Sequence, residues 1–170
     1  MKQLIPDMFV KDVYNIDYND LQRRGIKAII TDLDNTLVEA DRLDATPELV
    51  RWLAEIRARG FRVMIVSNNR ETRVSRFAEP LRIPYIHAAK KPFNTSFRKA
   101  LQRMETTSKE TAVIGDQLFT DVLGGNRLGL YTILVTPISK REGLGTKINR
   151  CLEKLVYAWM KKRGIERWEE

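Results

Sequence analysis

The chain has 170 residues, of which 43% are hydrophobic and 31% are charged. This length suits one domain with its own core, and the composition excludes a disordered chain. A single cysteine, Cys151, and a single histidine, His87, exclude an internal disulfide, a cysteine-rich zinc site and a multi-histidine metal centre. No stretch approaches the roughly 20 apolar residues of a membrane span, and residues 1–10 do not resemble a signal peptide. We therefore expect a cytoplasmic protein.

The charge is strongly positive. Thirty lysines and arginines against 22 aspartates and glutamates give a formal net charge of +8. A basic surface attracts nucleic acid, anionic lipid or phosphorylated substrates, but it is equally typical of a surface tuned for solubility. Charge alone does not choose between these interpretations.

Strands and helices are predicted to alternate from residue 20 to residue 135. The expected strands cover residues 27–33, 61–66, 83–87, 111–114 and 131–135. The expected helices cover residues 20–24, 47–60, 70–79, 93–104 and 118–128, the second with Thr46 as N-cap and Pro47 at its first position. The fourth is expected to bury Phe93, Phe97, Ala100, Leu101 and Met104. Such alternation predicts an α/β protein with a doubly wound, mainly parallel, Rossmann-like sheet flanked by helices.

Both ends of the chain are apolar enough to need a partner surface. Residues 1–16 are expected to pack on the domain or on something else. Residues 147–163 read as a basic amphipathic helix, and two interpretations stay open: packing on the sheet edge, or lying in a membrane interface. The apolar residues of its expected stripe are Ile148, Cys151, Leu152, Leu155, Val156, Trp159 and Met160.

Polar residues follow four of the expected strands, at the sheet edge where α/β proteins bind ligands. Asp32 and Asp34 end the first strand, and alternation places both carboxylates on one side of an extended chain. Two acids there are costly unless a cation or hydrogen-bond donors compensate them. An ordinary cap or Asx turn would need only one aspartate.

The other three strand ends are weaker signals taken singly. Ser67 could be an N-cap, the Lys90-Lys91 pair could be solvated, Asp116 could be a cap, and Asp121 could be a surface acid. Together they predict one crevice that holds acids, a hydroxyl and a lysine. Oxygen ligands without a histidine cluster favour a hard cation, above all Mg²⁺. A metal, a lysine and a hydroxyl around a carboxylate predict phosphoryl transfer.

At these positions the chain resembles the haloacid dehalogenase (HAD) superfamily. The segments DLDNTL, VSNN, KKP and GDQLFTD match its four motifs in order and at fitting intervals. The stretches LIPDMFV and YNIDYNDLQRRGIKAIITDLDNTL are similar to the capless subclass IIIA, in particular the YqeG type, whose branch includes phosphatidylglycerophosphate phosphatases.

The resemblance implies roles for particular residues. Asp32 would be the nucleophile that forms an aspartyl-phosphate, Asp34 the general acid and base, and Thr36 the residue that orients Asp34. Ser67, the Asn68 backbone and Lys91 would bind the phosphoryl group, with Lys90 the less suited lysine. The expected Mg²⁺ ligands are Asp32, Asp116 and the backbone carbonyl of Asp34. Asp121 would act through a water or by orienting Lys91.

The intervals between the motifs are too short for a cap domain, which predicts an open site suited to a large or surface-held substrate. We expect one domain over residues 1–170, with a core at 27–135, an N-terminal extension at 1–26 and a C-terminal amphipathic helix at 140–170.

The expected activity is Mg²⁺-dependent removal of phosphate from phosphatidylglycerophosphate, with peripheral contact at the inner face of the membrane. The alternatives are a phosphatase of the same mechanism on a soluble or nucleic-acid phosphate, and a binding protein associated with the ribosome or a GTPase. Nucleic acid is not favoured, because no dedicated motif or stacking platform is evident.

Overall fold

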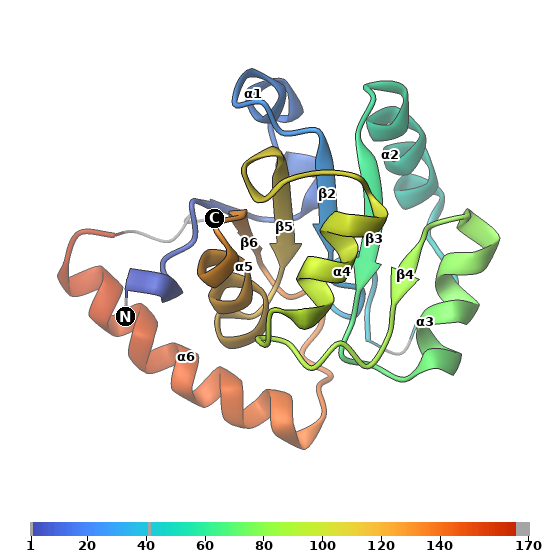
Figure 1. Ribbon diagram of the computed structural model, residues 1–170. Helices are drawn as coiled ribbons and strands as arrows, with labels where there is room; N and C mark the ends of the chain where they lie inside the picture. The colour runs from blue at the N-terminus through green and yellow to red at the C-terminus, as the bar shows by residue number, and fades with distance from the viewer. Residues whose placement is uncertain (1, 41, 166–170) are drawn as a thin grey trace.

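A computed structural model describes residues 2–40 and 42–165 of the chain. Residue 1 and residues 166–170, which the expected terminal segments 1–26 and 140–170 include, lie outside the described residues. The described part contains a six-stranded sheet in the order β1-β6-β5-β2-β3-β4 (Figure 1). All five pairings are parallel, which confirms the doubly wound α/β architecture. The strands are β1 (Met8–Val10), β2 (Ala28–Thr31), β3 (Arg62–Val66), β4 (Tyr85–Ile86), β5 (Thr111–Gly115) and β6 (Tyr131–Val135).

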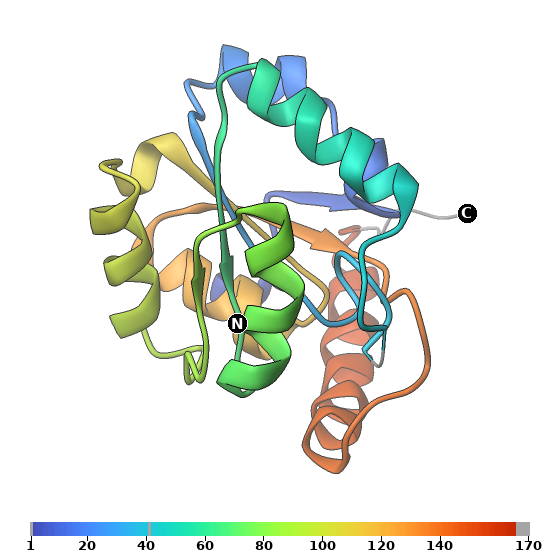
Figure 2. The same cartoon turned by 90° about the vertical axis from the view of Figure 1, so that its right-hand side faces the viewer.

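Helices cover both faces of this sheet (Figure 2). The first three helices pack on one face and α4 packs on the other. A π-helical turn, Leu118–Val122, runs directly into α5. The helices are α1 (Tyr18–Arg23), α2 (Pro47–Ala58), α3 (Glu71–Ala78), α4 (Thr95–Arg103), α5 (Leu123–Leu128) and α6 (Leu144–Lys162).

The central strand β2 is buried on both sides, which explains why its first three residues are all apolar. Ile29 faces the cluster formed with α1, α2 and α3, whereas its neighbours Ala28 and Ile30 face the cluster formed with α4. This alternation is the two-residue period of a strand. The strand carries no polar residue until its last position, Thr31, and Asp32 follows directly.

The N-terminal segment adds a strand that the sequence did not predict. β1 pairs in parallel with β6, with Met8 opposite Ile133. Asp7 fixes this edge, because its Oδ2 accepts from the Thr132 backbone N–H at 2.8 Å and from the Thr132 hydroxyl at 3.1 Å. A three-residue edge strand beside Pro6 has no local pattern that would reveal it, since its pairing depends on a partner more than 120 residues away.

A local signal sets the start of α2, whereas none sets the start of α4 where it was expected. The Thr46 hydroxyl caps α2 by accepting from the Leu49 backbone N–H at 3.1 Å, as expected. The expectation that Phe93 belongs to the buried face of α4 is wrong, because Phe93 is 68% exposed. Its N–H closes a turn on Lys90 at 3.0 Å, and α4 begins only at Thr95. The other four residues predicted for that face are buried.

The last helix, α6, does not pack its apolar stripe as one face. Val156 and Met160 are buried against Leu118, Val122 and Leu134. Ile148, Leu152 and Leu155 remain exposed. None of the described helices is long and apolar enough to cross a bilayer.

Candidate active site

The predicted strand ends meet at the point where the strand order of the sheet reverses, between β5 and β2. β2 and β5 are neighbours, but the chain continues from β2 toward β3 and from β5 toward β6 on opposite sides. Such a switch point leaves a crevice at the carboxyl ends of the strands. A pocket of about 340 Å³ opens there. The residues that line it include Asp32, Asp34, Asn35, Ser67, Asn68, Asn69, Lys91, Gln117, Thr120, Gly143 and Thr146.

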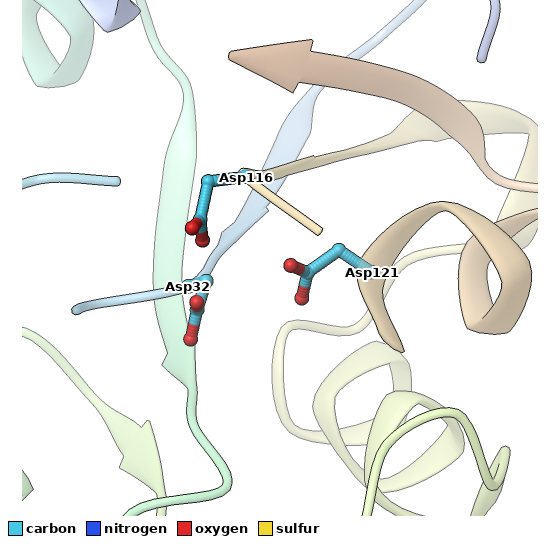
Figure 3. Close-up of side chains that lie close together, drawn as sticks. All are labelled: Asp32, Asp116 and Asp121. Atoms are coloured by element: carbon cyan, nitrogen blue, oxygen red, sulfur yellow. The ribbon is translucent and has the colours of Figure 1, made fainter. Parts of the chain in front are cut away.

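Three carboxylates converge in this crevice. Asp32 follows β2, Asp116 follows β5, and Asp121 projects from the π-helical turn (Figure 3). Each can offer one oxygen such that the three atoms lie within 4.8 Å of one another, and all three side chains are buried. The structure therefore brings together acids that lie up to 89 positions apart in the sequence.

Gly115 makes the close approach of Asp121 possible. A Cβ atom at this position would lie 2.1 Å from Cγ of Asp121, which is far inside contact distance. Any other residue would therefore displace the Asp121 carboxylate. The group that approaches the backbone closely at Gly115 is thus the Asp121 carboxylate.

Lys91 compensates two of the three carboxylates. Its Nζ lies 3.0 Å from Oδ1 of Asp32 and 2.6 Å from Oδ1 of Asp121. Burial by itself would lower the pKa of Lys91, but the charges of Asp121 and Asp32 outweigh it and raise the pKa above its ordinary value. Lys91 is therefore charged at every physiological pH. Lys90 is exposed, so Lys91 is the lysine that faces the site.

Asn68 holds the loop that carries this lysine. Its Oδ1 accepts from the Lys91 backbone N–H at 2.7 Å, and its Nδ2 donates to the Lys91 carbonyl at 3.3 Å. Ser67 is buried, and its Oγ accepts from the Asn69 backbone N–H at 3.1 Å. Ser67 is thus a capping residue of this turn and a pocket residue at the same time.

The Asp34 carboxylate lies in the pocket wall but turns away from the cluster of three. Asn69 Nδ2 donates to its Oδ2 at 2.8 Å, and Arg73 Nε donates to its Oδ1 at 3.1 Å. Burial raises the pKa of Asp34, although the hydrogen bond from Asn69 and the charge of Arg73 partly oppose the shift. A carboxyl with a raised pKa can exchange a proton nearer to neutral pH.

The expectation that Thr36 orients Asp34 is wrong. Its hydroxyl donates to Oδ1 of Asp116 at 3.0 Å, whereas Asn69 and Arg73 hold Asp34. The physical reason is that the chain leaves its extended path at Asn35, where φ is 60°. This left-handed residue turns Thr36 toward the end of β5.

Arg150 and Asn35 also belong to the site, although the sequence did not reveal their part in it. Arg150 of α6 donates to the carboxylate of Asp116, and it also binds Glu142 at 2.7 Å and Glu153 at 2.9 Å. Asn35 accepts from the Ser139 hydroxyl at 2.7 Å and donates to the Arg141 carbonyl at 3.2 Å. Both contacts tie the chain after β6 to the site. Their only sequence signal was that Asn35 stands between two motif residues.

The charges of the site fit a bound cation. Six acidic side chains gather in and beside the pocket against four basic ones, which is an excess of two negative charges when every group is counted at its formal charge. The acids are Asp32, Asp34, Asp116, Asp121, Glu142 and Glu153, and the bases are Arg73, Lys91, Arg141 and Arg150.

The pKa values of the acids reflect this crowding. Burial, and then the charges of Asp32 and Asp121, raise the pKa of Asp116 well above its ordinary value. Burial likewise raises the pKa of Asp121 to about 6, against the lowering effect of Lys91. Buried oxygen donors that repel one another in this way suit a hard divalent metal ion.

Known proteins are similar to this chain in sequence and in fold. A family model described as mitochondrial PGP phosphatase matches residues 1–139. The Bacillus subtilis (strain 168) protein named "Probable phosphatase YqeG" is 49% identical over 169 residues, which are 99% of this chain and 98% of that protein. Phosphatidylglycerophosphate phosphatase 1, chloroplastic/mitochondrial, of Arabidopsis thaliana is 29% identical, over 94% of this chain and 49% of that protein.

A solved structure shows the same fold at low sequence identity. D,D-heptose 1.7-bisphosphate phosphatase from B. bronchiseptica, complexed with magnesium and phosphate, has a TM-score of 0.54 and 16% identity. The match covers 76% of this chain and 99% of that one. The family match, the close YqeG relative and the shared fold agree: this chain belongs to the PGP phosphatase family and is a HAD-superfamily phosphatase of the YqeG type.

Proposed function

We propose that the protein is a Mg²⁺-dependent phosphomonoesterase that forms an aspartyl-phosphate on Asp32 and acts on phosphatidylglycerophosphate. The arrangement of two carboxyls supports the mechanism best. Asp32 lies beside the buried ammonium of Lys91, while Asp34, two residues on, is held apart by Asn69 and Arg73. The ammonium of Lys91 lies 3.0 Å from the carboxyl that attacks, whereas burial raises the pKa of the Asp34 carboxyl, which suits it to proton transfer.

The reaction then proceeds in two displacements. The Asp32 carboxylate attacks phosphorus, the bond to the ester oxygen breaks, and the Asp34 carboxyl gives its proton to the leaving alkoxide. In the second step Asp34 takes a proton from water, the hydroxyl attacks phosphorus, and the bond to Asp32 breaks to release phosphate. Both aspartates return to their starting states.

The surrounding groups stabilise the negative phosphoryl oxygens. Lys91 supplies a charge, and Ser67 supplies a hydroxyl at the same pocket. Mg²⁺, held by the carboxylates of Asp32 and Asp116 and the backbone carbonyl of Asp34, would offset further charge on these oxygens. Asp121 holds Lys91 in place through its 2.6 Å contact.

Two observations support a phospholipid substrate. The family and the Arabidopsis relative are named for phosphatidylglycerophosphate. In addition, the intervals between the motifs are filled by α2 and α3, so that no cap domain is inserted there over the pocket in the described chain. An uncovered pocket admits a phosphate that remains attached to a lipid in a bilayer.

The test is phosphate release from phosphatidylglycerophosphate in mixed micelles with Mg²⁺. We expect wild-type protein to release phosphate, Asp32→Asn to be inactive, and the exposed matched control Asp44→Asn to equal wild type. Activity retained by Asp32→Asn would overturn the assignment of the nucleophile. Cleavage of para-nitrophenyl phosphate without cleavage of the lipid would overturn the substrate and favour a soluble or nucleic-acid phosphate.

A further inference from the structure

The helix α6 has a second apolar face that the fold leaves uncovered. Leu144, Ile148, Leu152 and Leu155 are 82%, 64%, 46% and 69% exposed. Their spacing of three or four residues places them on one side of a helix. The inward side is different, since Val156 and Met160 are buried against the core. We call the four exposed residues the α6 outer face.

Such a concentration of exposed apolar residues is unusual within this molecule. Eight large hydrophobic side chains are exposed in the described chain, and four of them form the α6 outer face. A fifth, Ile138, lies on the segment that leads into α6. A contiguous apolar patch on an otherwise polar surface marks an interaction site, whereas scattered single residues do not.

A row of lysines borders this face. Lys147, Lys154 and Lys161 are exposed and follow one another at seven-residue intervals, which is about two helical turns. They therefore line one flank of the outer face along its whole length. Lysines beside an apolar stripe let the stripe enter an apolar layer while the ammonium groups remain among anionic groups.

Within residues 2–40 and 42–165, no acid of α6 offsets these lysines on the outward side of the helix. Glu153 is the single acidic residue of the helix, and its side chain is turned inward, 2% exposed, to bind Arg150 and the Leu118 backbone N–H. Glu142, just before the helix, also binds Arg150 and is 9% exposed. The outward side of α6 thus carries an apolar stripe, and its charged residues are all basic.

The outer face begins at the mouth of the active site. Gly143 and Thr146, at the start of α6, line the same pocket as Asp32 and Asp34. Figure 2 shows α6 standing beside the segment that follows β2, at the edge of the molecule. Leu144 lies between these two residues in the chain, so a surface that contacts this end of the α6 outer face lies near the pocket.

We propose that the α6 outer face and its lysine row dock on an anionic phospholipid bilayer and hold the pocket at the level of the headgroups. The proposal deepens the proposed function, on which its catalytic benefit rests. A bilayer fits better than a second copy of the chain, because an antiparallel dimer along α6 would bring two lysine rows together, and any dimer would join two chains of net charge +8. A bilayer with anionic headgroups instead matches both the apolar stripe and the charge.

The native Cys151 allows a direct test. It is the single cysteine of the chain, it is exposed, and it lies on α6 between Ile148 and Leu152. We would attach an environment-sensitive fluorophore there and add vesicles of phosphatidylglycerol and phosphatidylcholine. We expect a blue shift and at least a threefold gain in emission, lost at high salt and weak with phosphatidylcholine alone. The matched control carries the same dye on Val50→Cys in a Cys151→Ser background, an exposed site on α2, and should not respond.

Vesicle flotation of unlabelled protein then separates the contributions. Ile148→Ser with Leu155→Ser should reduce the bound fraction at least tenfold, and Lys147→Gln with Lys154→Gln should remove the preference for anionic vesicles. Val50→Ser should match wild type. All variants should retain wild-type activity on para-nitrophenyl phosphate, because none of these residues belongs to the catalytic site. Deleting the whole helix would not be a clean test, since Arg150 would be lost with it.

The outcomes distinguish this proposal from the proposed function. Wild-type protein that stays unbound to anionic vesicles overturns docking, whatever its activity. Vesicle binding that the paired serine variant retains also overturns it. So does self-association in sedimentation that the serine variant abolishes, which would assign the face to a second copy. Binding as expected without cleavage of phosphatidylglycerophosphate would leave docking standing and overturn the lipid substrate.

Discussion

Arg150 of α6 donates two hydrogen bonds to Asp116, which follows β5. One Nη donates to the Asp116 carboxylate and the other to its backbone carbonyl. The same guanidinium binds the buried Glu153 at 2.9 Å, and Glu153 in turn accepts from the Leu118 backbone N–H at 2.7 Å. Arg150 therefore connects α6 directly to Asp116, a predicted metal ligand. Carboxylate neighbours raise the pKa of Arg150 despite its burial, so the charge persists.

Removing this guanidinium should destabilise the protein strongly. Arg150→Met leaves the carboxylates of Asp116 and Glu153 buried without their partner, a change that costs about 3–5 kcal/mol in comparable sites. Urea unfolding followed by circular dichroism would measure the loss. Lys154→Met, at an exposed position of the same helix, should change the free energy of unfolding by less than about 0.5 kcal/mol. Equal values for the two variants would show that the Arg150 contacts do not stabilise the fold.

Mg²⁺ should stabilise the folded protein through the acidic cluster. A ligand at about 100 times its dissociation constant adds about 2.7 kcal/mol to the free energy of unfolding. We therefore expect the melting temperature to rise with Mg²⁺ and to fall back with EDTA. Asp116→Asn should abolish most of the rise, because Asp116 is one of the three converging carboxylates. A rise of the same size in Asp116→Asn would place the metal elsewhere.

The pH profile should report on Asp34. The protonated form gives its proton in the first step, so kcat/KM should fall as the pH rises through its pKa. Arg73→Met removes a cation that favours the charged carboxylate, and therefore raises this pKa and moves the alkaline limb to higher pH. Arg76→Met, at an exposed position of the same helix, is the control. An unmoved limb in Arg73→Met would assign the limb to another group.

Gly115→Ala should damage both stability and catalysis. The new methyl group collides with the Asp121 carboxyl, and overpacking of this kind costs about 1–3 kcal/mol. The displaced Asp121 also releases Lys91, so activity should drop at least tenfold. Gly145→Ala is the matched control, because a Cβ there meets nothing within 4 Å. Wild-type kinetics in Gly115→Ala would show that Asp121 does not position Lys91.

Much of the fold was predictable because its signals are local. Buried parallel strands are continuous apolar runs, and β2, β3 and β6 were predicted on that basis within a few residues. The residue types of Thr46 and Pro47 were enough to predict the start of α2. The strand order then placed the strand-end residues at one edge, because the carboxyl ends of parallel strands share it. The convergence of Asp32, Lys91, Asp116 and Asp121 could therefore be expected from the sequence.

The sequence by itself determined the strand pattern and the kinds of side chain at each strand end, since both depend on neighbouring residues. Only the tertiary structure decided which groups pair across the chain. It added β1 at the edge of the sheet, turned Thr36 toward Asp116, and brought Arg150 into the site. It also divided the apolar stripe of α6 into a buried and an exposed side. Each of these outcomes depends on partners more than 20 residues away, and no local pattern carries that information.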